Sequence, residues 1–317
     1  GKMYVNKYFP PEAKARVEEL VANLKKAYKS RIRNVSWMTD ATREKALEKL
    51  DAMTVKVGYP DEWRDYSDLD IAPGKYFENV LQASAFNIDY NLDKIGKKAD
   101  PKEWHMTPQT VNAYYNPANN EIVFPAAILQ PPFFFQHGDD AVNYGAIGVV
   151  IGHEMTHGFD DKGRLFDKNG NLNEWWTEED SREFNKRAEQ LVAHFGDFVP
   201  IKDMHLDGEL TLGENIADNG GLHIALDALH LSLKDMDAQK IDGFTPEQRF
   251  FLSYAQIWRQ NIRDEELMRR LKEDVHSPGE YRVNGGVFNV DAFYNAFSEV
   301  SASDRLYRAP EKRADIW

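Results

Sequence analysis

The 317-residue sequence contains no cysteine. This absence excludes disulfide bonds and any metal site built from thiolate ligands. The sequence also lacks a run of 18 apolar residues, so no stretch is suited to span a membrane as a helix. Basic residues are outnumbered, because 39 Lys and Arg stand against 52 Asp and Glu and give a formal net charge of −13. Such a charge argues against binding to nucleic acid or to an anionic membrane surface.

The chain is long enough for one large or two ordinary domains, and its 42% hydrophobic and 12% aromatic residues can form a sizeable core. Residues 111–115 and 121–124 flank the turn sequence Asn-Pro-Ala-Asn-Asn and predict a hairpin at the edge of a small sheet. Residues 58–75, rich in Pro, Gly and Asp, predict an irregular crossover. Helical signals predict helices over 10–33, from 39 to beyond 50, and over 76–100, 141–158, 178–196, 214–236, 246–261, 264–271 and 289–299. We therefore expect a mainly α fold with a small β-sheet.

One five-residue motif carries most of the chemical information. His153-Glu154-Met155-Thr156-His157 reads H-E-x-x-H, and on a helix the two histidines share one face. Two imidazoles in this arrangement chelate a single Zn²⁺, and Glu154 reaches a water on the metal. The alternative is a chance match on a solvated helix. The small, apolar flank Gly145–Gly152 favours a buried helix and therefore the metal site.

A catalytic zinc needs a third protein ligand, and Glu214 is the candidate. Glu214 and Asp218 are four residues apart at the start of a predicted helix, so they share a face. We interpret Glu214 as the ligand and Asp218 as a carboxylate that orients one histidine, with Asp160 doing the same for the other. Without the H-E-x-x-H motif, Glu214 and Asp218 would be interpreted as carboxylates that the dipole favours at the N-terminus of a helix.

Several segments together resemble the neprilysin (M13) family of zinc metallopeptidases, most of all its bacterial PepO-type endopeptidases. The chain reads H-E-x-x-H-G-F-D-D at 153–161 and G-E-N-I-A-D-N-G-G at 213–221. Further similar blocks lie at 111–115, 124–134, 143–145, 250–258 and 276–285. The resemblance covers essentially the whole chain. It implies a mainly α, thermolysin-like (gluzincin) catalytic domain with a small β-sheet.

The resemblance also implies a domain organisation. Residues 1–70 resemble part of the family's helical lid domain, and residues 71–317 resemble its zinc metallopeptidase catalytic domain. Gly1–Val5 resembles the middle of a family chain, so we expect the N-terminal half of that chain to be absent and to be a partner of this segment. The lack of cysteine departs from the animal members and favours a bacterial origin. The expected location is the bacterial cell envelope, the periplasm or the medium, with the cytoplasm second.

The resemblance assigns roles to individual residues. One Zn²⁺ per chain is held by His153, His157 and Glu214, with Glu154 as the general base. His276 stabilises the oxyanion, and Arg282 binds a substrate carbonyl. Asp218 is also counted among the catalytic groups. Asn112 and Ala113 bind the substrate backbone at a sheet edge. From the residues alone, an isolated His and Arg in a loop such as 276–285 are typical of solvated surface.

Four apolar residues are candidates for a pocket beyond the cleaved bond, although core packing explains each equally well: Phe133, Val150, Ile257 and Trp258. Such a pocket predicts cleavage on the N-terminal side of large apolar residues. The leading hypothesis is a zinc endopeptidase that acts on short peptides. A catalytically incompetent fragment or peptide-binding module is the alternative. An aminopeptidase would need a Gly-rich acidic motif before His153, and none is present.

One loop imitates a calcium site. Residues 167–178 place Asp, Asn or Glu at positions 1, 3, 5, 7 and 12 of an EF-hand pattern, namely Asp167, Asn169, Asn171, Asn173 and Glu178. Leu172 stands where the pattern requires Gly, so we interpret the segment as a turn. The histidines without ligand spacing are interpreted as surface or packing residues: His105, His137, His194, His205, His223 and His230.

Overall fold

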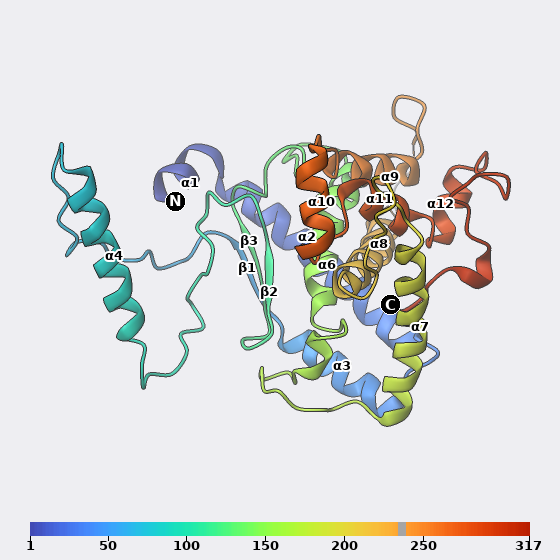
Figure 1. Ribbon diagram of the computed structural model, residues 1–317, viewed down its shortest axis with the longest axis horizontal. Helices are drawn as coiled ribbons and strands as arrows, with labels where there is room; N and C mark the ends of the chain where they lie inside the picture. Colours follow the sequence, from blue (N-terminus) through green and yellow to red (C-terminus); the bar gives the residue numbers. More distant parts are fainter. Residues whose placement is uncertain (234–238) are drawn as a thin grey trace.

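The computed structural model describes residues 1–233 and 239–317, and helices dominate it (Figure 1). In chain order they are α1 (Lys2–Tyr8), α2 (Pro11–Asn34), α3 (Asp40–Ala52), α4 (Tyr76–Leu92), α5 (Asp140–Asn143), α6 (Val149–His157), α7 (Glu178–Gly196), α8 (Leu212–Leu233), α9 (Pro246–Ile257), α10 (Asp264–Glu273), α11 (Gly279–Val287) and α12 (Asp291–Ala296). The prediction of a mainly helical chain with a small sheet is confirmed. Residues 234–236, at the end of a predicted helix, lie outside the described residues.

The sheet has three strands in the order β1 (Thr54–Gly58), β3 (Glu121–Pro125) and β2 (Tyr114–Asn116). The predicted hairpin is confirmed, since β2 and β3 pair antiparallel. β3 lies in the middle and is buried along its whole length. β1 pairs parallel with β3. It was not predicted, because a five-residue strand directly after a helix is too short to show a clear alternation of apolar and polar residues. β2 therefore forms one edge of the sheet.

α6 and α8 cross with their backbones in close contact. A Cβ at Gly152 would lie 2.9 Å from the Gly221 Cα, and a Cβ at Gly221 would lie 2.6 Å from the carbonyl oxygen of Val149. Larger residues at these positions would force the helices apart. Because no side chain separates the two helices, residues one and two turns from the crossing can meet across it.

The first sixty residues share the core of the rest of the chain. α2 packs against α8, and the buried ring of Tyr28 makes edge contacts with Phe159 and Trp317. Asp180, at the start of α7, accepts hydrogen bonds from the Thr39 amide and from the Thr42 hydroxyl of α3. The division of the chain at residue 70 stays a prediction.

α4 lies apart from the helical body, beyond the sheet, at the end of long connections (Figure 1). It has no buried residue, and Tyr76, Phe77 and Ile88 are among its exposed side chains. The predicted helix over 76–100 ends at Leu92, and Gly96 then adopts a positive φ of 76° in the following turns. No helix within the described ranges is both long and apolar enough to cross a membrane.

Two further segments differ from their prediction. The predicted helix over 141–158 contains a π-helical turn at Tyr144–Gly148, where Gly145 abuts the Phe250 backbone of α9. Residues 279–287, predicted as part of a loop, form α11. Gly285 in this helix allows the ring of Phe195 to approach closely, since a Cβ there would lie 2.4 Å from that ring.

The 167–171 segment is a turn, as predicted. The Asp167 carboxylate accepts hydrogen bonds from the backbone amides of Asn169 and Asn171 and from the Asn171 side chain. These bonds close the turn within the loop itself.

Candidate metal centre

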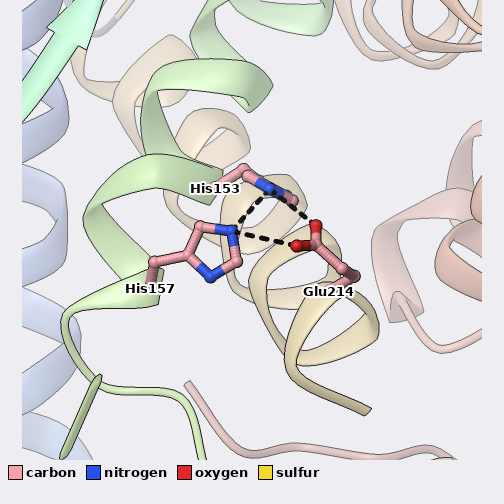
Figure 2. Close-up of side chains that lie close together, drawn as sticks. All are labelled: His153, His157 and Glu214. Atoms are coloured by element: carbon pink, nitrogen blue, oxygen red, sulfur yellow. Dashed lines mark hydrogen bonds and ion pairs between the residues drawn. The ribbon is translucent and has the colours of Figure 1, made fainter. Parts of the chain in front are cut away.

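Three side chains converge where α6 meets the first turn of α8. Figure 2 shows His153 and His157 pointing from α6 toward Glu214. The Nε2 atoms of the two histidines lie 2.9 Å apart, and the Glu214 carboxylate lies 3.2 Å from His153 Nε2 and 3.7 Å from His157 Nε2. The ligand atoms of this group all lie within 4.8 Å of one another. The spacing inferred from sequence thus brings all three predicted ligands to one point.

Two carboxylates hold the far side of the imidazoles. His153 Nδ1 lies 2.8 Å from Asp218 Oδ1, and His157 Nδ1 lies 2.7 Å from Asp160 Oδ2. When each ring is neutral, as a metal ligand must be, Nδ1–H donates in both bonds and each Nε2 keeps its lone pair for the shared point. Asp218 and Asp160 therefore occupy the orienting positions predicted for them.

The donor set fits a divalent zinc ion. Tetrahedral ligands about 2.0–2.1 Å from zinc are separated by roughly 3.3 Å, close to the separations in this group. Glu214 Oε2 is buried, and its neighbours among the described residues are His153 Nε2 at 3.2 Å and His276 Nε2 at 3.3 Å, neither of which forms a hydrogen bond of good geometry to it. Burial by itself would lower the pKa of His153, but Asp218 and Glu214 raise it to about 10. The site therefore favours a positive charge between these groups.

Glu154 lies in the same cavity as the three candidate ligands. Its side chain is buried, and burial raises the pKa of the carboxyl group although the adjacent histidines oppose the rise. A carboxylate whose proton affinity is raised by desolvation is suited to accept a proton near neutral pH.

His276 reaches the centre from the segment before α11. Its Nε2 lies 3.3 Å from Glu214 Oε2, and its Nδ1 lies 2.8 Å from Asp274 Oδ1. Sequence reasoning missed Asp274, although an acid two residues before a candidate histidine is a usable signal. The pair leaves His276 Nε2 at the edge of the cavity, where nearly half of the side chain is exposed.

Arg282, on α11, is buried beside the centre. Its Nε and Nη2 each donate a 2.6 Å hydrogen bond to the two oxygens of Asp218, and its guanidinium lies 3.8 Å from the Trp258 ring centroid. Bidentate pairing of this kind fixes both partners. Asp218 therefore connects Arg282 to His153, a link between distant segments that the sequence did not predict.

A cavity of about 550 Å³ opens over the centre. Asn112 and Ala113, which directly precede the edge strand β2, line it, as do the predicted pocket residues Phe133, Val150 and Trp258. Val111 and Tyr115 line it as well and were not predicted. Ile257 belongs to the buried core, and its place in a substrate pocket stays a prediction.

The sequence model of "Peptidase family M13" matches residues 112–314, and a second model with the same description matches residues 1–60. The chain belongs to peptidase family M13. Its M13 relatives include the neutral endopeptidase of Lactococcus lactis, which is 40% identical over 100% of this chain and 49% of its own length.

Solved M13 structures have the same fold. The zinc metalloprotease Zmp1 of Mycobacterium tuberculosis is 51% identical with a TM-score of 0.95, over 100% of this chain and 48% of that one. PepO of Lactobacillus rhamnosis is 37% identical with a TM-score of 0.91, over 99% of this chain and 49% of that one. The predicted thermolysin-like fold is confirmed. This chain spans about half the length of the curated M13 relatives it matches.

Proposed function

We propose that the chain is the catalytic part of a zinc-dependent endopeptidase that hydrolyses oligopeptides and binds one Zn²⁺. The observation that carries the proposal is the convergence of His153, His157 and Glu214 within 4.8 Å, with Glu154 in the same cavity. Membership of a peptidase family supports it. The name of Zmp1, a zinc metalloprotease, supports the choice of metal.

Each group has a distinct task in this proposal. Bound zinc would lower the pKa of a water and polarise the scissile carbonyl. Glu154 accepts the proton of the attacking water and passes it to the departing amine. His276 donates a hydrogen bond to the oxyanion, in a ring orientation set by Asp274. Asp218 and Asp160 keep His153 and His157 in the tautomer that presents Nε2.

The walls of the cavity support a peptide as the substrate. β2 is an edge strand, and an extended peptide beside Asn112 and Ala113 can pair with the backbone of that edge. Phe133, Val150 and Trp258 present an apolar surface in the same cavity. We infer cleavage on the N-terminal side of large apolar residues. Arg282 lines the cavity and holds a substrate carbonyl in this proposal.

A peptide-binding module without catalysis is the second candidate. It is favoured by the length of the chain, which is about half that of the curated relatives it matches. In that case, cleavage would also need the part of the relatives' length that this chain does not span, to enclose the substrate. Binding and cleavage of the same peptide separate the two candidates.

The decisive assay follows hydrolysis of an internally quenched peptide by the wild type and by Glu154→Gln, with zinc content measured in both. We expect one zinc per chain in both proteins and a loss of cleavage of about 10²–10⁴-fold in the variant. Glu299→Gln, on the exposed surface, is the matched control and should keep full activity. Zinc absent from both proteins would overturn the proposal, whereas zinc and peptide binding without cleavage would support the binding module.

Two further measurements sharpen the proposal. Blocking the peptide's N-terminus should leave the rate unchanged, because an endopeptidase needs no free amine, whereas an aminopeptidase would stop. Replacing a large apolar residue after the cleaved bond by Ala should lower kcat/KM by about tenfold or more. The expected location in the bacterial envelope or outside the cell stays a prediction, which cell fractionation can test.

A further inference from the structure

A buried lysine lies against the segment that follows the α6 C-terminus, two residues of which, Gly163 and Phe166, also line the cavity. Lys49, on α3, is 1% exposed. Its Nζ donates hydrogen bonds of 2.6, 2.8 and 2.6 Å to the backbone oxygens of Gly158, Gly163 and Phe166. The three N–H groups of the ammonium thus have three acceptors. Within the described residues, no carboxylate forms a direct ion pair with it.

The three carbonyls belong to one loop, residues 158–166, which directly follows His157 and contains a single 3-10 turn at Gly163–Leu165. The loop turns back on α6 so tightly that a Cβ at Gly163 would lie 1.7 Å from the His157 carbonyl oxygen. Irregular backbone that is buried needs partners for its polar groups, because it forms no regular ladder. Lys49 supplies donors to three of them.

A short series of bonds connects Lys49 to the metal centre. Lys49 binds the Gly163 carbonyl, and the Gly163 amide donates a 2.6 Å hydrogen bond to Asp160 Oδ1. The Lys162 amide donates to the same oxygen at 2.9 Å. The other oxygen of Asp160 accepts the Nδ1–H of His157 at 2.7 Å. The position of Asp160 is therefore set by the loop that Lys49 holds.

We propose that Lys49 is a positioning residue for the metal centre: it fixes the 158–166 loop and, through Asp160, the imidazole of His157. This inference rests on the proposed zinc site. The rings of Tyr115, Phe159 and Trp175 lie 6.0, 5.5 and 5.8 Å from the ammonium and offset part of the cost of burying it. An apolar side chain of similar length would avoid the cost of burying a charge. The ammonium contributes three directed bonds to one loop.

Lys49→Met in the whole 317-residue chain tests the proposal. We expect zinc affinity, measured by competition with a chelator, to fall by about 10–100-fold, as for loss of an orienting partner of a ligand. Lys25→Met is the matched control. Lys25 Nζ also donates to backbone carbonyls, those of Asp51 and Met53 at the end of α3, but does not bind the 158–166 loop. Its zinc affinity should equal that of the wild type.

A double-mutant cycle with Asp160→Asn separates positioning from general support of the fold. If Lys49 acts through Asp160, the double variant should bind zinc about as weakly as Asp160→Asn alone. Losses that multiply would overturn the proposal, as would a Lys49→Met affinity within twofold of the wild type. Lys49→Gln, which retains an amide donor, takes the same place in the cycle if Lys49→Met does not fold. A wild type that binds no zinc would instead overturn the proposed function.

Discussion

At the scale of single residues, the centre depends on carboxylates that do more than one task. Asp218 accepts hydrogen bonds from His153 and from two nitrogens of Arg282. Burial would raise the pKa of Asp218, but Arg282 and His153 outweigh burial and lower it. Asp218 therefore stays ionised and holds two segments of the chain in register at the metal site.

Asp218→Asn should weaken zinc binding by about 10–100-fold, because an amide is uncharged and has a single acceptor oxygen, whereas the Asp218 carboxylate accepts from both His153 and Arg282. Chelator competition measures the loss. Asp274→Asn is the matched comparison, since Asp274 also binds a histidine Nδ1, that of His276. It should reduce kcat and leave zinc affinity unchanged. Equal zinc affinities for Asp218→Asn and the wild type would contradict the assigned role.

The candidate ligands and their orienting carboxylates could be predicted, because spacing along a helix determines which side chains share a face. His153 and His157, and likewise Glu214 and Asp218, share a face whatever surrounds their helices. The partnership of Asp218 with Arg282 could not be predicted, because it depends on α11, which the sequence presented as a loop. Residue spacing determines local neighbours, whereas partners from distant segments depend on packing.

At the scale of elements, the crossing of α6 and α8 makes the site. The sequence predicted both helices, but not that Gly152 and Gly221 would bring their backbones into contact. Gly221 lies three residues after Asp218 and shares its face of α8, and Gly152 directly precedes His153 on α6, so the contact lies beside the candidate ligands. A glycine in a helix costs stability relative to alanine, and here it allows the approach.

Gly221→Ala should therefore destabilise the protein by about 1–3 kcal/mol and weaken zinc binding, because the new methyl group meets the α6 backbone. Gly196→Ala, at the end of α7, is the control, since a Cβ there meets nothing within 4 Å. Its stability should be unchanged or slightly higher. Urea unfolding of both variants measures the difference in the free energy of unfolding. Equal values for Gly221→Ala and Gly196→Ala would show that α6 and α8 can move apart without loss of stability.

At the scale of the whole molecule, the centre lies where segments far apart in the chain meet. α3 supplies Lys49, α6 supplies two candidate ligands, α8 supplies the third, and α11 supplies Arg282. The sequence predicted most of these elements but not β1, which brings the first segment into the sheet beside β3. The stability of the whole fold therefore affects the candidate metal centre. Contacts between elements away from the centre, such as α7 and α11, contribute to that stability.

His194 provides such a contact and makes it sensitive to acid. Its Nε2–H donates to the Gly285 carbonyl of α11, and its Nδ1 accepts from Arg308, so the ring must be neutral. Burial, and then the charge of Arg308, lower the pKa of His194 to about 3. The unfolded chain takes up this proton near pH 6.5, so between pH 6.5 and 3 it binds more protons than the folded state.

The free energy of unfolding should consequently fall with acidification in this window, with a contribution from His194 of up to about 1.4 kcal/mol per pH unit. His194→Gln keeps a donor for Gly285 and removes the titrating ring, so its stability should fall less steeply. Urea unfolding from pH 7 to 4 in chelator measures both slopes without a contribution from metal loss. His137→Gln, on the surface, should retain the wild-type slope. Parallel slopes for His194→Gln and the wild type would show that another group controls acid stability.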